Sequence, residues 1–68
     1  MFLELETRDG IWVCINLEQV IMIQGVRTDG SKGYTKIHLK GGAVIATHKT
    51  YSRFINEVLQ ANKRVTVY

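Results

Sequence analysis

The chain has 68 residues, of which 46% are hydrophobic and 22% charged; it has no proline and a formal net charge of +3. A chain of this length forms one domain, residues 1–68, and buries only about 60% of its unfolded surface. We therefore expect modest stability and help from a partner or a second copy. The composition excludes low-complexity segments. No stretch approaches the roughly 18 apolar residues of a membrane span, and the charged start lacks the apolar run of a signal peptide.

The only cysteine, Cys14, lies inside an apolar run at residues 12–15. A single cysteine cannot form an intrachain disulfide. Its apolar neighbours predict a buried, unreactive thiol and not a reactive one. We expect a cytoplasmic protein with no membrane partner.

Charge is distributed unevenly along the chain. Residues 1–29 hold two basic and five acidic side chains, a net charge of −3, whereas residues 30–68 hold seven basic and one acidic, a net charge of +6. A positive field concentrated on one region attracts anionic partners such as nucleic acid. The alternative is a basic surface that is simply solvated.

The first residues predict a β-hairpin. Residues 2–8 alternate apolar with charged side chains, which is typical of a half-buried strand. Asp9 and Gly10 favour a two-residue turn because both tolerate a positive φ. The strand at residues 11–15 should therefore pair antiparallel with the first.

The next two strands, at residues 11–15 and 20–23, are apolar on both faces. One helix covers only one face of a small sheet, so either the sheet curls or another subunit covers the second face. Between them, Asn16 is expected to cap a single helical turn, with a base-reading amide as the alternative. We assign a homo-oligomer interface to the apolar side chains Trp12, Cys14, Ile21 and Ile23.

A turn cluster with two glycines at residues 28–33 leads into a strand at residues 34–40. A phosphate-cradling loop would need a helix there, so that interpretation is weak. By the two-residue period, Thr35, Ile37 and Leu39 face inward. The outward row consists of Tyr34, Lys36, His38 and Lys40. Lysines neutralise phosphates and an aromatic ring stacks on a base, so this row is a candidate nucleic-acid surface; the alternative is a solvated face or an edge strand.

After a turn of two glycines, residues 43–47 predict a fifth strand. From Thr50, a credible N-cap, the pattern changes to a helical period that ends near Asn62. Its apolar face contains Tyr51, Phe54, Ile55, Val58 and Leu59. Residues 65–67 can add a last short strand. The prediction is an α+β domain with one small, mostly antiparallel sheet of five to six strands and one C-terminal amphipathic helix.

Catalytic and metal motifs are missing from the sequence pattern. His38 and His48 have no HExxH or CxxC context, and Cys14 lies in an apolar strand and not beside a base. We therefore expect a protein that is not an enzyme and that has no catalytic residue, metal site or cofactor.

The stretch IWVCINLEQVIMIQG at residues 11–25, followed by a strand, a glycine turn, a strand and TYSRFINEVL, resembles the second half of the LytTR DNA-binding domain of bacterial response regulators. The chain is equally similar to the small FlbD-type flagellar proteins, whose pattern is matched by TRDG at residues 7–10, INL at 15–17 and VIMI at 20–23. The resemblance covers about residues 3–59 and implies a regulatory role in a bacterial or phage setting.

The two resemblances imply two kinds of partner. The LytTR-like pattern implies DNA binding, although the arginine of that family's Ser-Arg motif is replaced by His48, with Lys49 next. The FlbD-like pattern implies a protein–protein interaction or assembly module that oligomerises through the second apolar face. The candidate nucleic-acid contacts are Lys32, Tyr34, Lys36, His38, Lys40, His48, Lys49 and Arg53.

Overall fold

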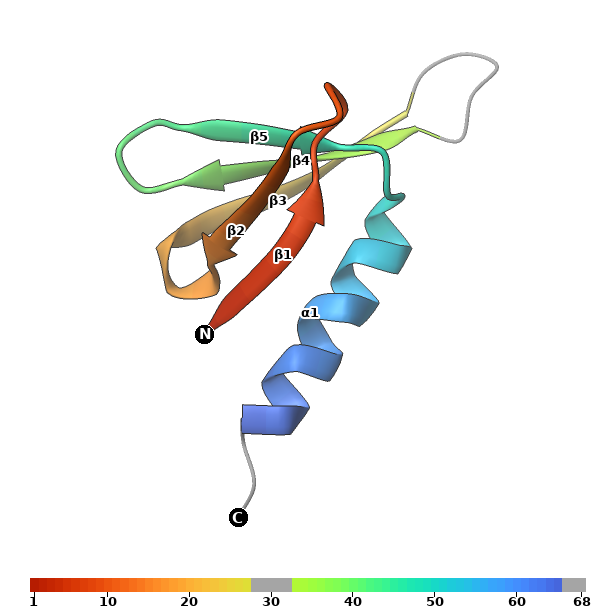
Figure 1. Ribbon diagram of the computed structural model, residues 1–68. Helices are drawn as coiled ribbons and strands as arrows, with labels where there is room; N and C mark the ends of the chain where they lie inside the picture. Colours follow the sequence, from red (N-terminus) through yellow and green to blue (C-terminus); the bar gives the residue numbers. More distant parts are fainter. Residues whose placement is uncertain (28–32, 66–68) are drawn as a thin grey trace.

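The structure is a computed structural model that describes residues 1–27 and 33–65 (Figure 1). In chain order its elements are β1 (Phe2–Glu6), β2 (Trp12–Asn16), the 3-10 turn η1 (Leu17–Gln19), β3 (Val20–Val26), β4 (Tyr34–Leu39), β5 (Val44–Thr47) and α1 (Tyr51–Val65). The predicted α+β class is confirmed, with antiparallel strand pairs and a C-terminal helix.

The hairpin of β1 and β2 has a longer turn than the sequence predicted. The Thr7 N–H donates to the Ile11 carbonyl at 2.8 Å, which leaves residues 8–10 as a three-residue loop. Gly10 adopts a φ of +84° in this loop, the left-handed geometry that closes three-residue hairpins. Thr7 and Ile11 close this loop, so β1 ends at Glu6, before the predicted end at Arg8, and β2 begins at Trp12 and ends at Asn16.

The strands form two sheets, so the prediction of a single sheet was wrong. β1 and β2 form one sheet, and β3, β4 and β5 form the other, with β4 in the centre. The chain leaves the hairpin through η1, where the Asn16 side chain accepts a hydrogen bond from the Glu18 N–H at 3.0 Å, as the predicted cap requires. Within the described residues, an isolated bridge between Thr7 and Thr47 joins the two sheets.

The strands of the second sheet differ at their ends from the predicted ones. β3 continues to Val26, three residues beyond the prediction, because Val26 pairs with Tyr34 of β4. β4 ends at Leu39, which places Lys40 in the following turn. β5 begins at Val44.

A small core lies where the two sheets and α1 meet. The hairpin contributes Leu5 and Ile15, β4 contributes Ile37 and α1 contributes Phe54, each at most 4% exposed. Half-buried side chains surround this core: Leu3, Val13, Leu17, Val20, Ile23, Leu39, Ile45 and Val58. The inward orientation predicted for Ile37 and Leu39 is confirmed.

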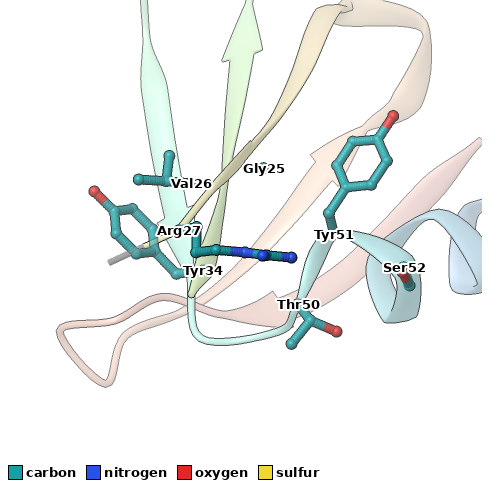
Figure 2. Close-up of a pocket in the computed structure, with 7 residues that line it drawn as sticks. All are labelled: Gly25, Val26, Arg27, Tyr34, Thr50, Tyr51 and Ser52. Carbon is teal, nitrogen blue, oxygen red and sulfur yellow. The ribbon is translucent and has the colours of Figure 1, made fainter. Parts of the chain in front are cut away.

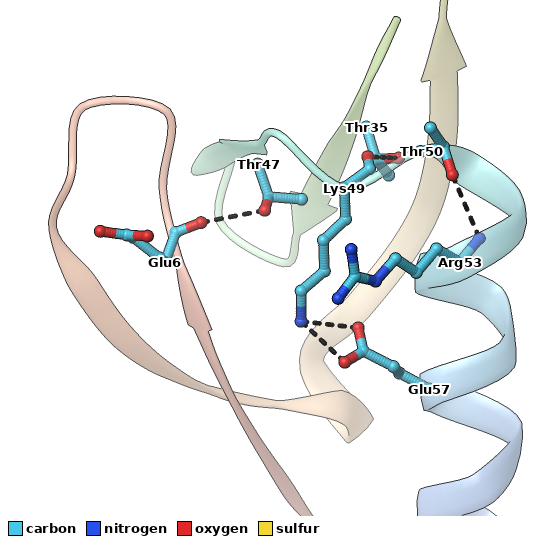
Figure 3. A network of polar contacts seen from close by, with 7 residues as sticks. All are labelled: Glu6, Thr35, Thr47, Lys49, Thr50, Arg53 and Glu57. Atoms are coloured by element: carbon cyan, nitrogen blue, oxygen red, sulfur yellow. Dashed lines mark hydrogen bonds and ion pairs between the residues drawn. The ribbon is translucent and has the colours of Figure 1, made fainter. Parts of the chain in front are cut away.

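Two buried threonines link the layers (Figure 3). The Thr35 hydroxyl donates to the Lys49 carbonyl at 2.8 Å, and the Thr47 hydroxyl donates to the Glu6 carbonyl at 2.9 Å. The first bond fixes the segment that enters α1, and the second fixes the end of β1 against β5. These bonds position α1 and the hairpin on the three-stranded sheet.

The helix starts where the sequence predicted and ends later. The Thr50 hydroxyl accepts a hydrogen bond from the Arg53 N–H at 3.4 Å, which confirms the predicted N-cap. α1 continues to Val65, beyond the predicted end near Asn62. Val65 is therefore helical, so the predicted last strand is wrong at this residue, and the other residues of that prediction, 66–67, lie outside the described residues.

Only part of the apolar helical face reaches the core. Phe54 is fully buried and Val58 packs against the core. Tyr51 and Leu59 are 47% and 51% exposed. The helix thus covers one side of the molecule incompletely.

Candidate nucleic-acid interface

Three residues of the predicted outward row lie on the central strand of the three-stranded sheet, on its outer face. They are Tyr34, Lys36 and His38. Lys36 lies opposite Gln24 of β3 and Ala46 of β5. His38 Nε2 lies 3.1 Å from Gln24 Oε1, within hydrogen-bond distance. Because β4 is paired on both sides, the alternative that it is an edge strand is wrong.

The other lysines predicted near this row do not extend it. Lys40 is exposed in the turn after β4, and its backbone N–H donates to the Gln19 carbonyl at 2.8 Å. This turn lies at the end of β4 away from Tyr34. Lys32 lies outside the described residues.

An arginine that the sequence did not single out reaches this surface. The Arg8 guanidinium lies 3.9 Å from the centroid of the Tyr34 ring, in a cation–π arrangement. The bridge between Thr7 and Thr47 brings the hairpin turn, which carries Arg8, next to Tyr34. Sequence reasoning missed Arg8 because it belongs to the acidic half of the chain.

Lys49, which precedes α1, forms an ion pair with Glu57 of the same chain (Figure 3). Its Nζ donates to Glu57 Oε1 at 2.8 Å and lies 2.6 Å from Oε2. Glu57 therefore offsets the charge that was predicted to meet phosphate. Arg53 is exposed on the first turn of α1. His48 is exposed and lines a separate groove of about 540 Å³ between the hairpin turn and β5.

A surface pocket of about 380 Å³ opens between the ends of β3 and β4 and the first turn of α1 (Figure 2). It is lined by Gly25, Val26, Arg27, Tyr34, Thr50, Tyr51 and Ser52. The Arg27 side chain points across the pocket toward the start of α1. Of the residues that line it, only Tyr34 was predicted from the sequence as a nucleic-acid contact.

Gly25 makes this pocket possible because it lets the helix approach the strand. A Cβ at this position would lie 2.9 Å from the Cβ of Tyr51. A glycine inside a strand is a signal of such close approach, and it was available in the sequence. The approach brings the start of α1, which carries a partial positive charge, to the same pocket as Arg27.

The pocket can bind a ligand that combines negative charge with a flat ring. Arg27 presents donors in the fork geometry that suits phosphate oxygens. The hydroxyls of Thr50 and Ser52 add further donors at the same place. The rings of Tyr34 and Tyr51 point away from each other (Figure 2), and Arg8 lies over the Tyr34 ring, so stacking is available at Tyr51 and on the face of Tyr34 that Arg8 leaves open.

The four residues predicted at an oligomer interface divide between surface and core. Trp12 and Ile21 are 65% and 63% exposed. Cys14 is exposed, so the prediction of a buried thiol was wrong. The hairpin turns its Ile15 side inward and leaves Cys14 on the outside. Ile23 packs against the core, which removes it from a surface interface.

Within residues 1–27 and 33–65, no three His, Cys, Asp or Glu side chains are grouped so that they could hold a metal ion. In the same part of the chain, no helix has the length and apolar character needed to cross a membrane. Comparisons with protein-family models, curated proteins and solved structures gave no match to this chain. Function is therefore inferred from the surfaces themselves.

Proposed function

We propose that the protein is a small, non-enzymatic regulator that binds nucleic acid in the cytoplasm through the pocket between β3, β4 and α1. The observation that carries this proposal is the composition of the pocket. Arg27 and the start of α1 supply positive charge and N–H donors for a phosphate. Tyr34 and Tyr51 supply rings for a base or sugar.

The charge around the pocket supports the same ligand class. Arg8 lies against Tyr34, and Lys36 is two residues along β4 from Tyr34. Arg53 is on the first turn of α1 but points toward Lys49 and Glu57 (Figure 3). A positive surface raises the local concentration of a polyanion and its rate of encounter. The resemblance to LytTR domains, which bind DNA, supports this proposal.

Fluorescence anisotropy with a labelled DNA duplex and a labelled single-stranded RNA tests the proposal. For about three phosphate contacts on duplex DNA, log K should fall with log salt concentration at a slope of about −3. Arg27→Gln should weaken binding about tenfold, which corresponds to about 1.4 kcal/mol. Lys40→Gln removes the same charge at the other end of β4 and should change affinity little. Absence of binding to both probes at low salt would rule the proposal out.

A second candidate function is assembly, and the distribution of apolar side chains favours it. Among residues 1–27 and 33–60, four hydrophobic residues form the buried core, whereas eight large ones are 47% to 66% exposed. The exposed ones are Phe2, Ile11, Trp12, Ile21, Met22, Val44, Tyr51 and Leu59. Exposed apolar side chains that share one face mark protein–protein contacts, and Met22 and Val44 share a face because both pair with His38. The resemblance to FlbD-type proteins supports an interaction or assembly module.

Sedimentation velocity over a dilution series tests this second function. The chain contains a single tryptophan, so its emission reports on Trp12 alone. An assembling protein should dissociate on dilution, with Trp12 emission shifting to longer wavelength. A protein that stays monomeric at every concentration, with constant emission, is not an assembly module.

A further inference from the structure

The hairpin has an outer face that combines aromatic and acidic side chains. Leu5 and Ile15 point into the core, so the alternate residues of β1 and β2 point away from it. Glu4 lies opposite Cys14, and Glu6 lies opposite Trp12. We call this surface the acidic face; it consists of Phe2, Glu4, Glu6, Trp12 and Cys14. Phe2 and Trp12 are 66% and 65% exposed, so the face presents two large rings beside two carboxylates.

The three-stranded sheet has an outer face with the opposite charge. One row across the strands places His38 between Met22 and Val44, and the next row contains Lys36 at its centre. We call this surface the basic face; it consists of Met22, Gln24, Lys36, His38, Val44 and Ala46. Met22 and Val44 are 48% and 52% exposed. Apolar side chains therefore flank the positive charge on this face.

Charge determines which of these faces can meet. A contact between two acidic faces would place carboxylates against carboxylates, and a contact between two basic faces would place Lys36 of one copy against Lys36 of the other. Repulsion between like charges disfavours both symmetric pairings. An acidic face against a basic face pairs Glu4 and Glu6 with Lys36. It also brings the ring of Trp12 to a cation and to apolar partners. Each face is therefore complementary to the opposite face of a second copy of this chain.

We infer that copies of the protein associate head to tail, with the acidic face of one copy on the basic face of the next. This inference rests on the second proposed function and names its surfaces. The two faces lie on opposite sides of the same core, since Leu5 and Ile37 meet between them. One copy therefore binds two neighbours through different surfaces, which is a heterologous contact that generates a closed ring or a filament. The nucleic-acid pocket at the start of α1 borders the basic face, because Tyr34 lines the pocket and lies on the same side of β4 as Lys36.

Charge reversal tests the pairing. The double variant Glu4→Lys, Glu6→Lys has two positive faces, and the variant Lys36→Glu replaces the lysine of the basic face by a carboxylate. Each variant alone should self-associate at least tenfold more weakly than the wild type in sedimentation velocity. An equimolar mixture should recover large assemblies, because each face then finds its opposite. Circular dichroism checks that both variants keep the wild-type fold.

Two probes on the acidic face report assembly in the wild-type protein and need no variant. The rate of Cys14 labelling by a thiol reagent should fall as protein concentration rises, and Trp12 emission should shift to shorter wavelength over the same range. If the wild type stays monomeric, both the assembly function and this pairing are wrong. If the wild type assembles but the variants assemble equally well, or the mixture shows no recovery, assembly stands and the pairing is wrong.

Discussion

At the scale of single residues, two buried hydroxyls hold the layers of the fold together. Thr35 and Thr47 are 0% and 1% exposed, and each donates to a backbone carbonyl of another segment. A buried carbonyl that loses its donor destabilises the fold by about 1–3 kcal/mol. In a protein with so small a core, this is a large share of the free energy of unfolding.

Thr47→Val keeps the side-chain shape and removes the hydroxyl. We expect the free energy of unfolding in urea to fall by about 1–3 kcal/mol, because the Glu6 carbonyl is left without its donor. Thr47→Ser keeps the hydroxyl and should lose only about 0.8 kcal/mol for the missing methyl group. A valine variant as stable as the wild type would show that the bond contributes nothing.

Cys14 shows that the alternation of side chains along a strand does not determine which face of the strand packs into the core. The strand is apolar on both faces, so its pattern does not say which face packs inward. Contact with β4 and α1 decides this, and it turns the Ile15 side into the core. In dilute protein, we expect Cys14 to react with a thiol reagent at nearly the rate measured in denaturant. Strong protection under those dilute conditions would contradict the exposed position of Cys14.

At the scale of elements, the contact between β3 and α1 builds the pocket. Gly25→Ala places a Cβ 2.9 Å from that of Tyr51, and overpacking of this kind destabilises by about 1–3 kcal/mol. We expect a loss of thermal stability together with weaker nucleic-acid binding, because the start of α1 must move.

Gly42→Ala serves as the comparison for this prediction. No atom lies within 4 Å of a Cβ at Gly42, although its φ is +94°. This variant should lose about 1–2 kcal/mol from backbone strain and leave binding unchanged. Equal effects of the two variants on binding would show that the Gly25 contact does not shape the site.

The order and type of the elements from β1 to α1, and the antiparallel pairing of β1 with β2, could be predicted from local signals, but the division of the strands into two sheets could not. Alternation over residues 2–8 and the helical period after Thr50 predicted β1 and α1 from local signals. The division into two sheets depends on η1 and on the bridge between Thr7 and Thr47. That bridge joins residues forty positions apart, so no local pattern indicates it.

At the scale of the whole molecule, folding redistributes the charge that the sequence shows as two halves. Arg8 and Arg27 come from the acidic half, yet they lie at Tyr34 and at the pocket. Lys49 comes from the basic half and is paired with Glu57. The candidate site was therefore predicted only in part, because β3, β4 and α1 each contribute to it.

Because the core is small, we expect the thermal stability of the protein to depend on its assembly. If assembly covers exposed apolar side chains such as Trp12 and Val44, the native state is favoured by mass action. The midpoint of thermal unfolding should then rise with protein concentration. The charge-reversed variant Lys36→Glu is the control, and its midpoint should stay constant. A constant midpoint for the wild type would count against assembly.

Amide chemical shifts in a titration with a short DNA duplex test the central claim most directly. Nucleic-acid binding in the pocket predicts the largest changes at Gly25, Tyr51 and Ser52, which line it. The amides of Glu4 and Cys14, on the acidic face, should stay almost unchanged. Changes confined to the acidic face, or no changes at low salt, would contradict nucleic-acid binding at this pocket.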